Sequence, residues 1–216
     1  MRRRAIAMFA VGIGSMIAMV GCGVTKANAE APVTGAKVGV DPGQIHRLGP
    51  TNLKPTGSNQ LASFSGGCFW GTEDIFRQVP GVVATAVGYT GGNVSYPTYE
   101  QVCTHTTGHA ETVLVEFDPS KVSYQKLLSV FWENHDPTTL DSQGPDFGSN
   151  YRSAIWCYGI DEFNAAKKSR VAAQSKLTHK IVTEIHMAQP FFLAEDYHQQ
   201  YDEKHGTHFC PIGHGS

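Results

Sequence analysis

The sequence lacks a pronounced excess of charge of either sign. It has 17 lysines and arginines against 19 aspartates and glutamates, a formal net charge of −2. Arg2, Arg3 and Arg4 all lie at the extreme N-terminus, and removing three positive charges from −2 would leave −5. A near-neutral or acidic surface offers no electrostatic basis for binding a polyanion, so no nucleic-acid partner is expected.

Internal repeats are also missing, and cysteine is sparse. The chain of 216 residues has an ordinary globular composition, with 41% hydrophobic and 17% charged residues. About four fifths of it is expected to form one domain with a substantial core. The few cysteines are therefore worth considering one at a time, and they are Cys22, Cys68, Cys103, Cys157 and Cys210.

A cationic stretch followed by an apolar run opens the chain. "MRRR" precedes "AIAMFAVGIGSMIAMV", a pattern typical of an export signal. Two cleavage sites compete. "MVGC" would leave Cys22 as a lipidated residue, as in a bacterial lipoprotein, whereas "ANA" at 27–29 would allow ordinary cleavage before Glu30. An uncleaved anchor is the third interpretation, since 5–25 carries no charge.

All three interpretations place the folded part outside the cytoplasm. The protein is expected in the periplasm, or attached through its N-terminus to the outer side of the inner membrane or to the outer membrane. Residues 1–29 are predicted to be the export signal and 61–216 the folded domain. Residues 30–60 mix Pro, Gly, Lys and Thr with little periodicity, which predicts a tether or a loosely packed arm.

Hydrophobic periodicity predicts an α+β domain with a mixed sheet. The expected order is β-α-β-β-α-β-α-β-α, and its first six elements match the split β-α-β, ferredoxin-like arrangement. One sheet with helices packed against it is the simplest layering. Strands are expected over 61–66, 82–92, 109–119, 152–159 and 180–187, and helices over 68–81, 123–135, 161–177 and 192–204.

Cys68 stands out among the cysteines because "SGGCFWGTE" places it after two glycines at the start of a predicted helix. Free N–H groups and the helix dipole favour a thiolate there. Spacing alone leaves a buried packing residue equally open, and Thr72 and Glu73 are interpreted as ordinary helix residues. Cys157 lies in an apolar strand and is expected to be a buried hydrophobe. The role of Cys103, which follows "YEQV" near a polar loop, is left open by its surroundings in the sequence.

Ionisable residues gather ahead of the strand expected at 109–119. Glu111 lies on the same strand face as Val113 and Val115, and a buried carboxyl there could act as a general acid. A solvated glutamate at a strand start is the competing interpretation. A zinc site is a further alternative, but the spacing of the four ligand-type residues matches no closed zinc signature, and none is expected to bind metal: Cys103, His105, His109 and Glu111.

A second polar cluster, "GPDFGSNYRSAIW", precedes another strand. Its Asp146, Asn150, Tyr151 and Arg152 could line a site, although the pattern alone favours turn chemistry.

Five motifs together resemble a known family. "GGCFWGTE", "GYTGG", "PTYEQVC", "TGHAE" and "DFGSNYRSAIW" occur in this order and look like peptide methionine sulfoxide reductase A. The resemblance covers about 61–187, with a looser match in the tail. It implies a two-layer sandwich with a coiled C-terminal tail, and an enzyme that reduces the S epimer of methionine sulfoxide, free or in proteins.

The resemblance also assigns roles to individual residues. It implies that Cys68 is the nucleophile, that Glu111 is the acid and that Tyr99 and Tyr151 assist by hydrogen bonding. It implies a substrate-binding role for three further residues, in which the two aromatics hold the methyl group: Phe69, Trp70 and Asp146.

A sulfenic acid on Cys68 would need a second thiol. The family commonly uses cysteines in a glycine-rich tail, and Cys210 in "HFCPIG" fits that place, with Cys103 as the alternative. The resulting disulfide would be reset by a thioredoxin-like donor, with no bound cofactor, and a monomer is expected. Two rival hypotheses remain, a cysteine hydrolase or transferase built on Cys68 and an exported binding protein with a structural Cys68–Cys210 bridge.

Overall fold

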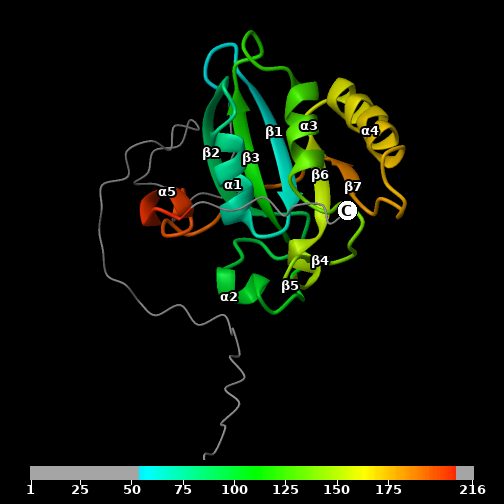
Figure 1. Ribbon diagram of the computed structural model, residues 1–216. Helices are drawn as coiled ribbons and strands as arrows, with labels where there is room; N and C mark the ends of the chain where they lie inside the picture. The colour runs from blue at the N-terminus through cyan, green and yellow to red at the C-terminus, as the bar shows by residue number, and fades with distance from the viewer. Residues whose placement is uncertain (1–53, 208–216) are drawn as a thin grey trace, which may run out of the picture. The chain divides into compact units, whose positions relative to one another are not determined.

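The computed structural model describes residues 54–207 (Figure 1). The expected export signal, most of the expected tether, Cys22 and Cys210 lie outside these residues. Within the described part of the chain, no helix is both long and apolar enough to cross a membrane. The main elements are β1 (Gln60–Gly66), α1 (Phe69–Arg77), β2 (Val82–Thr90), β3 (Ala110–Phe117), α3 (Tyr124–Glu133), β6 (Ser153–Cys157), α4 (Ile160–Gln174) and β7 (Glu184–Met187).

Six strands form one mixed sheet in the order β7-β6-β1-β3-β2-β8, where β8 is Phe192–Leu193. β3 lies antiparallel between β1 and β2, and β1 also pairs antiparallel with β6. The parallel pairing of β6 with β7 makes the sheet mixed. The order β6-β1-β3-β2 is that of a split β-α-β core, so the predicted fold class is confirmed.

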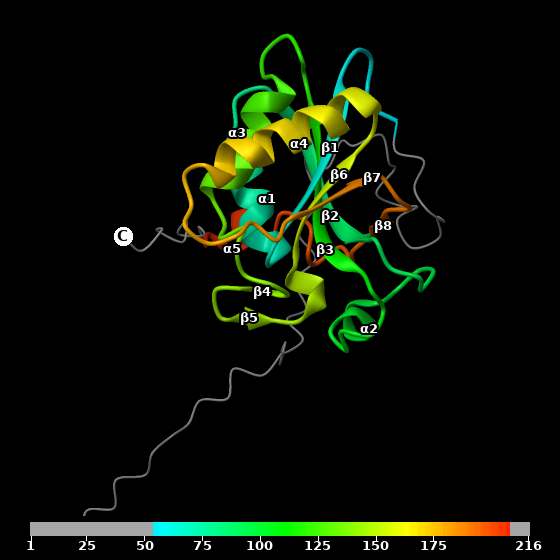
Figure 2. The same ribbon diagram turned by 90° about the vertical axis from the view of Figure 1, so that its right-hand side faces the viewer.

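Strand β3 is central and every residue in it is buried. Its side chains alternate as predicted. Val113, Val115 and Phe117 join the main core, while Leu114 joins a second cluster on the opposite face with Phe191. Apolar side chains from α1, α3 and α4 complete the main core, and Figure 2 shows these helices on one side of the sheet. The sheet therefore has one helical layer, and Phe191 and Leu193, at β8, pack on its other face.

The helix expected over 192–204 was wrong in its first half. Residues 192–193 form β8, which pairs with β2, and the helix α5 covers only Tyr201–His205. Pairing satisfies backbone groups of β2 that a helix would leave open at the sheet edge. Gly88 permits the approach, because a Cβ there would lie 2.3 Å from the backbone oxygen of Phe192. A partner distant in sequence thus overrode the local helical pattern.

Short elements around the expected polar clusters were not anticipated. They are α2 (Tyr99–Val102), β4 (Ser142–Gln143), β5 (Asp146–Phe147) and the 3₁₀ turn η2 (Ser149–Tyr151). α2 begins with a capping box, in which the Thr98 hydroxyl accepts from the Gln101 backbone N–H and the Gln101 side chain accepts from the Thr98 N–H. Elements of two to four residues carry too little periodicity to be predicted from a pattern.

Candidate active site

Cys68 lies where β1 turns into α1, at the N-cap position of the helix. Gly67 makes this turn possible. Its φ of 95° suits glycine, and a Cβ there would lie 2.5 Å from the side chain of Gln143. The hairpin of β4 and β5 therefore packs directly against the residue before the cysteine. Cys68 itself is partly buried and forms no disulfide with the other described cysteines.

Glu111 lies beside the cysteine, on the neighbouring end of β3. The backbone N–H of Phe69, the first residue of α1, donates to Glu111 Oε2 at 3.1 Å. The side chain is only 2% exposed. Burial raises the pKa of this carboxyl to about 8, so it holds its proton at neutral pH. The interpretation of Glu111 as a solvated glutamate is therefore wrong, and the buried acid is what the structure contains.

The pKa of the Cys68 thiol is not lowered overall, although its position at a helix start predicted a thiolate. Backbone N–H groups of Trp70 and Gly71 do lower its pKa, as expected at a helix N-terminus. Burial raises the pKa, and the negative charges of Glu111 and Asp146 raise it further, so the net shift is upward. The thiol is therefore protonated at neutral pH, and the charge on Glu111 controls how easily it ionises.

Asp146 in β5 and Tyr151 in η2 lie near Cys68 and Glu111. Burial raises the pKa of the Tyr151 hydroxyl, and the charges of Glu111, Asp146 and Cys68 raise it further. Burial likewise raises the pKa of Asp146. The mutual influence of these groups shows that the structure gathers four of the sequence-predicted residues in one site, with Tyr151 present as a hydrogen-bond donor rather than a phenolate.

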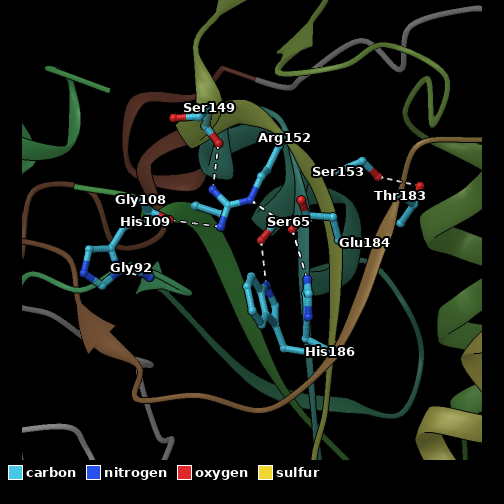
Figure 3. A network of polar contacts seen from close by, with 12 residues as sticks. Ser65, Gly92, Gly108, His109, Ser149, Arg152, Ser153, Thr183, Glu184 and His186 are labelled. Carbon is cyan, nitrogen blue, oxygen red and sulfur yellow. Dashed lines mark hydrogen bonds and ion pairs between the residues drawn. The ribbon is translucent and has the colours of Figure 1, made fainter. Parts of the chain in front are cut away.

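Arg152 ties the tyrosine turn to the chain that enters β3. Its guanidinium donates to the backbone oxygen of Ser149 at 2.8 Å and to that of Gly108 at 3.0 Å, and it pairs with Glu184 (Figure 3). One side chain thus connects η2, the loop before Glu111 and strand β7. The two interpretations of this polar cluster, as a turn or as part of a site, are both correct, because the turn η2 carries Tyr151.

The aromatic residues after the cysteine differ in their surroundings. Phe69 is buried, 5.9 Å from the ring of Tyr89, whereas Trp70 is partly exposed and stacks on Tyr201 at 3.7 Å. Tyr99 meets this group of rings through His198, at 4.4 Å. These rings form one aromatic cluster, the aromatic wall, to which the C-terminal segment contributes His198 and Tyr201. The substrate-binding role of Phe69 and Trp70 stays a prediction.

His198 is a site residue that the sequence did not single out. It is fully buried, its Nδ1 accepts from Trp70 Nε1 at 3.0 Å, and its ring lies 5.0 Å from Phe69. Burial lowers its pKa to about 4, so the ring is neutral and a weak base. The cysteine hydrolase hypothesis, which needs a histidine base for Cys68, gains nothing from a ring held in this way. No motif in "AEDYHQQYDEK" pointed to the ring beforehand.

Glu73 is the second such residue, and its interpretation as ordinary helix was wrong. It is 1% exposed and accepts from Thr85 Oγ1 at 2.8 Å, from Gln200 N at 2.8 Å and from Gln200 Nε2 at 3.0 Å. These bonds fix the segment that carries His198 and Tyr201 onto α1. The signal was its place one turn after Trp70 on the buried face of the helix.

The remaining cysteines and candidate metal ligands are not part of the pair formed by Cys68 and Glu111. Cys157 is buried in β6, as predicted, next to the hydroxyl of Tyr124. Cys103 ends α2, and its charge is among those that raise the pKa of Tyr151. His109 bonds to backbone groups of Gly92 and Val94. Over residues 54–207, no group of three ligand-type side chains could hold a metal ion.

A partly buried thiol beside a protonated, buried carboxylic acid is an arrangement that suits a thiol enzyme, in which the acid could deliver a proton next to the atom that sulfur attacks. A family model described as peptide methionine sulfoxide reductase matches residues 60–216. The chain belongs to the peptide methionine sulfoxide reductase family, and it is an oxidoreductase that reduces peptide methionine (S)-sulfoxide.

Relatives and solved structures agree with this family. A peptide methionine sulfoxide reductase from Methanosarcina mazei is 57% identical over 150 residues, which cover 68% of this chain and 71% of the relative. One from Geobacter sulfurreducens is 53% identical over 155 residues, 71% of this chain and 96% of the relative. Mxr1 from Saccharomyces cerevisiae in reduced form is a structural neighbour at a TM-score of 0.70 and 33% identity, with 75% and 94% of the chains covered.

The ionisation of Glu111 should appear in the pH dependence of stability. The raised pKa means that the folded protein keeps a proton that the unfolded chain releases between the ordinary value of 4.5 and about 8. The stabilisation is therefore full below 4.5 and is lost as pH rises, at about 1.4 kcal/mol per pH unit, until the loss levels off above 8. Glu111→Gln cannot ionise and lacks this slope. Urea denaturation of both proteins across this pH range measures it, and parallel stability curves would contradict the assignment.

Proposed function

We propose that this enzyme repairs oxidised methionine in exported proteins, through a sulfenic acid on Cys68 and then an intramolecular disulfide. The observation that carries the chemistry is the hydrogen bond from Phe69 N–H to Glu111 Oε2, because it holds a protonated acid against the residue that follows the thiol. Family membership supports reduction of the sulfoxide, and the site geometry supports the assigned roles.

The first step exchanges one oxygen atom between two sulfurs. Cys68 sulfur attacks the sulfoxide sulfur and bonds to it, while Glu111 gives its proton to the sulfoxide oxygen. The sulfur–oxygen bond of the substrate then breaks as the oxygen bonds to Cys68 sulfur, and the sulfur–sulfur bond breaks as methionine leaves, so Cys68 becomes a sulfenic acid. The proton that the Cys68 thiol loses replaces the one that Glu111 has given up. The net change is a thiol plus a sulfoxide to a sulfenic acid plus a thioether, so no external proton is consumed.

The surrounding residues orient the substrate for this step. Tyr151 donates a hydrogen bond to the sulfoxide oxygen, and its raised pKa keeps it a donor. Tyr99 is assigned the same task, and Asp146 a polar contact with the substrate. Phe69 and Trp70 provide the apolar surface for the methyl group beside the attacked sulfur.

The second step requires another thiol. Cys210 attacks the sulfenic sulfur of Cys68, a disulfide forms and water leaves. A donor with two thiols then reduces this disulfide by exchange and is itself oxidised to a disulfide. A thioredoxin-like donor fits this role. Mxr1 has also been solved in complex with Trx2, and its reduced form is 33% identical to this chain.

Export rests on the N-terminal sequence. "MRRR" and the apolar run after it have the composition of an export signal. A thiol donor for an exported enzyme has to receive electrons across the membrane, so a membrane-relayed donor is part of the proposal. Its three forms are attachment through Cys22, release after residue 29, and an uncleaved anchor formed by the apolar run.

Replacement of the nucleophile tests the reaction itself. Cys68→Ser should reduce methionine (S)-sulfoxide no faster than buffer with dithiothreitol, because serine is a far weaker nucleophile toward sulfur. Cys103→Ser is the matched control and should keep wild-type activity, since dithiothreitol reduces the sulfenic acid directly. Chromatography of the methionine formed measures both. Activity that survives in Cys68→Ser would refute the nucleophile, and an inactive wild type would refute the function.

The resolving cysteine can be identified by the number of turnovers. Cys210→Ser should form one methionine per enzyme in a single round but lose steady turnover with thioredoxin, because its sulfenic acid cannot become an intramolecular disulfide. Cys103→Ser should keep both. The reverse result would assign the resolving role to Cys103, the alternative left by the sequence.

The mature N-terminus distinguishes the forms of export. Intact-mass spectrometry of the protein from a periplasmic or membrane fraction should show lipidated Cys22, a chain that begins at Glu30, or, for the uncleaved anchor, a full-length chain in the membrane fraction. A Cys22→Ala variant is the control, because it should remove the lipid mass and leave the second cleavage unaffected. A full-length chain recovered from the cytoplasm would refute export.

A further inference from the structure

Asn150 in η2 has a buried side-chain amide whose oxygen has a hydrogen-bond partner and whose nitrogen has none among the described residues. The residue is 1% exposed. Its Oδ1 lies 2.6 Å from His105 Nδ1, while its Nδ2 has no hydrogen-bond partner among the residues that the structure describes. An amide oxygen accepts only, so the bond requires a proton on His105 Nδ1 and directs the Asn150 N–H groups away from His105. A buried donor without a partner is costly, which makes its position informative.

The surrounding backbone maintains this orientation. His105 has a φ of 61°. Gly148 leaves room for its ring, since a Cβ there would lie 2.3 Å from two imidazole atoms and 2.7 Å from Asn150 Oδ1. Ser149 Oγ also donates to the His105 backbone oxygen at 3.2 Å. The pair of His105 and Asn150 is therefore locked between η2 and the loop that leads to β3.

Glu111 is the titratable group that Asn150 influences. The Asn150 side chain lies close enough to the carboxyl to lower its pKa, although its Nδ2 makes no hydrogen bond of ordinary geometry to it. The bond from Phe69 N–H also lowers the pKa. The other titratable groups near the carboxyl either raise its pKa or carry no positive charge that could lower it. They are Cys68 at the start of α1, Asp146 in β5, Tyr151 in η2 and Tyr89 in β2. Among the described residues that face it, no positive side chain compensates the Glu111 carboxylate.

We propose that Asn150 is a positioning residue for the acid, whose Nδ2 donates to the Glu111 carboxylate after the proton has gone to the sulfoxide oxygen, with His105 setting the direction of the amide. The inference rests on the proposed function, in which Glu111 gives up that proton. Proton transfer leaves a negative charge in a buried site, and fixed N–H donors from Phe69 and Asn150 are what stabilises it. Asn150 thus favours the product of the transfer more than the resting acid.

A direct titration of Glu111 tests this without turnover. In full-length protein that carries Cys68→Ser, the carboxyl of ¹³C-labelled glutamate is followed by NMR against pH. Asn150→Ala should raise the pKa of Glu111 above its value in the Cys68→Ser parent by about one unit, the effect of one lost hydrogen bond to a charged group. His105→Gly should shift it in the same direction by less, because glycine tolerates the backbone angle and only the orienting bond is lost.

Activity in the Cys68-containing enzymes provides the second measurement. Asn150→Ala should slow the reduction of methionine sulfoxide about tenfold in kcat, with little change in KM, and move the alkaline fall in rate to higher pH. Asn134→Ala is the matched control. That asparagine ends α3, donates to Val130 and is not among the groups that shift the pKa of Glu111, so neither the titration nor the rate profile should move.

The outcomes separate this inference from the function on which it rests. An unchanged or lowered Glu111 pKa in Asn150→Ala would overturn the inference while wild-type activity upheld the function. If Asn150→Ala does not fold, His105→Gly decides in the same way. A wild type without sulfoxide reductase activity would overturn the proposed function, whatever the titration shows.

Discussion

The hydrogen bond from Phe69 N–H to Glu111 is the contact on which the site depends. It joins the first residue of a helix to the end of a central strand, and so sets the thiol and the acid side by side. The same bond stabilises the charged form of Glu111, while burial favours the protonated form more strongly. Because a carboxylate here raises the pKa of Cys68, the two groups form one proton-sharing unit.

Around this unit the fold supplies supports from distant segments. Glu73 binds Gln200, which places His198 against Trp70 and Phe69. Arg152 joins the tyrosine turn to the loop before Glu111. None of these supports is formed by neighbours in sequence, and each consists of a buried or half-buried polar side chain whose partners are backbone groups or other side chains. Their common effect is to restrict the aromatic wall and the turn to one arrangement.

The main elements could be predicted because their signals are local. Alternation identified β3, and helical spacing identified α1 and α3. The failures have a physical pattern too. The segment at 192–204 contains helix-forming residues, but β2 had an open edge and Phe192 paired with it. Glu73 was interpreted as an ordinary helix residue, because its place on the buried face of α1 does not by itself indicate that Gln200 will cover it. The site motifs identified Cys68, Glu111 and Tyr151 only when taken together with the family resemblance.

The linear order of residues is enough to say which chemical groups are present and roughly where the chain turns to expose them. Glycines before Cys68, the alternation around Glu111 and the turn residues around Tyr151 act through bonds and spacing that are local, so they can be recognised in the linear chain. The tertiary structure decided the protonation of these groups. Burial by segments far apart in sequence keeps the Cys68 thiol and the Glu111 carboxyl neutral, against the helix-start effect at the cysteine. Desolvation depends on everything that surrounds a group, and only the folded chain specifies those surroundings.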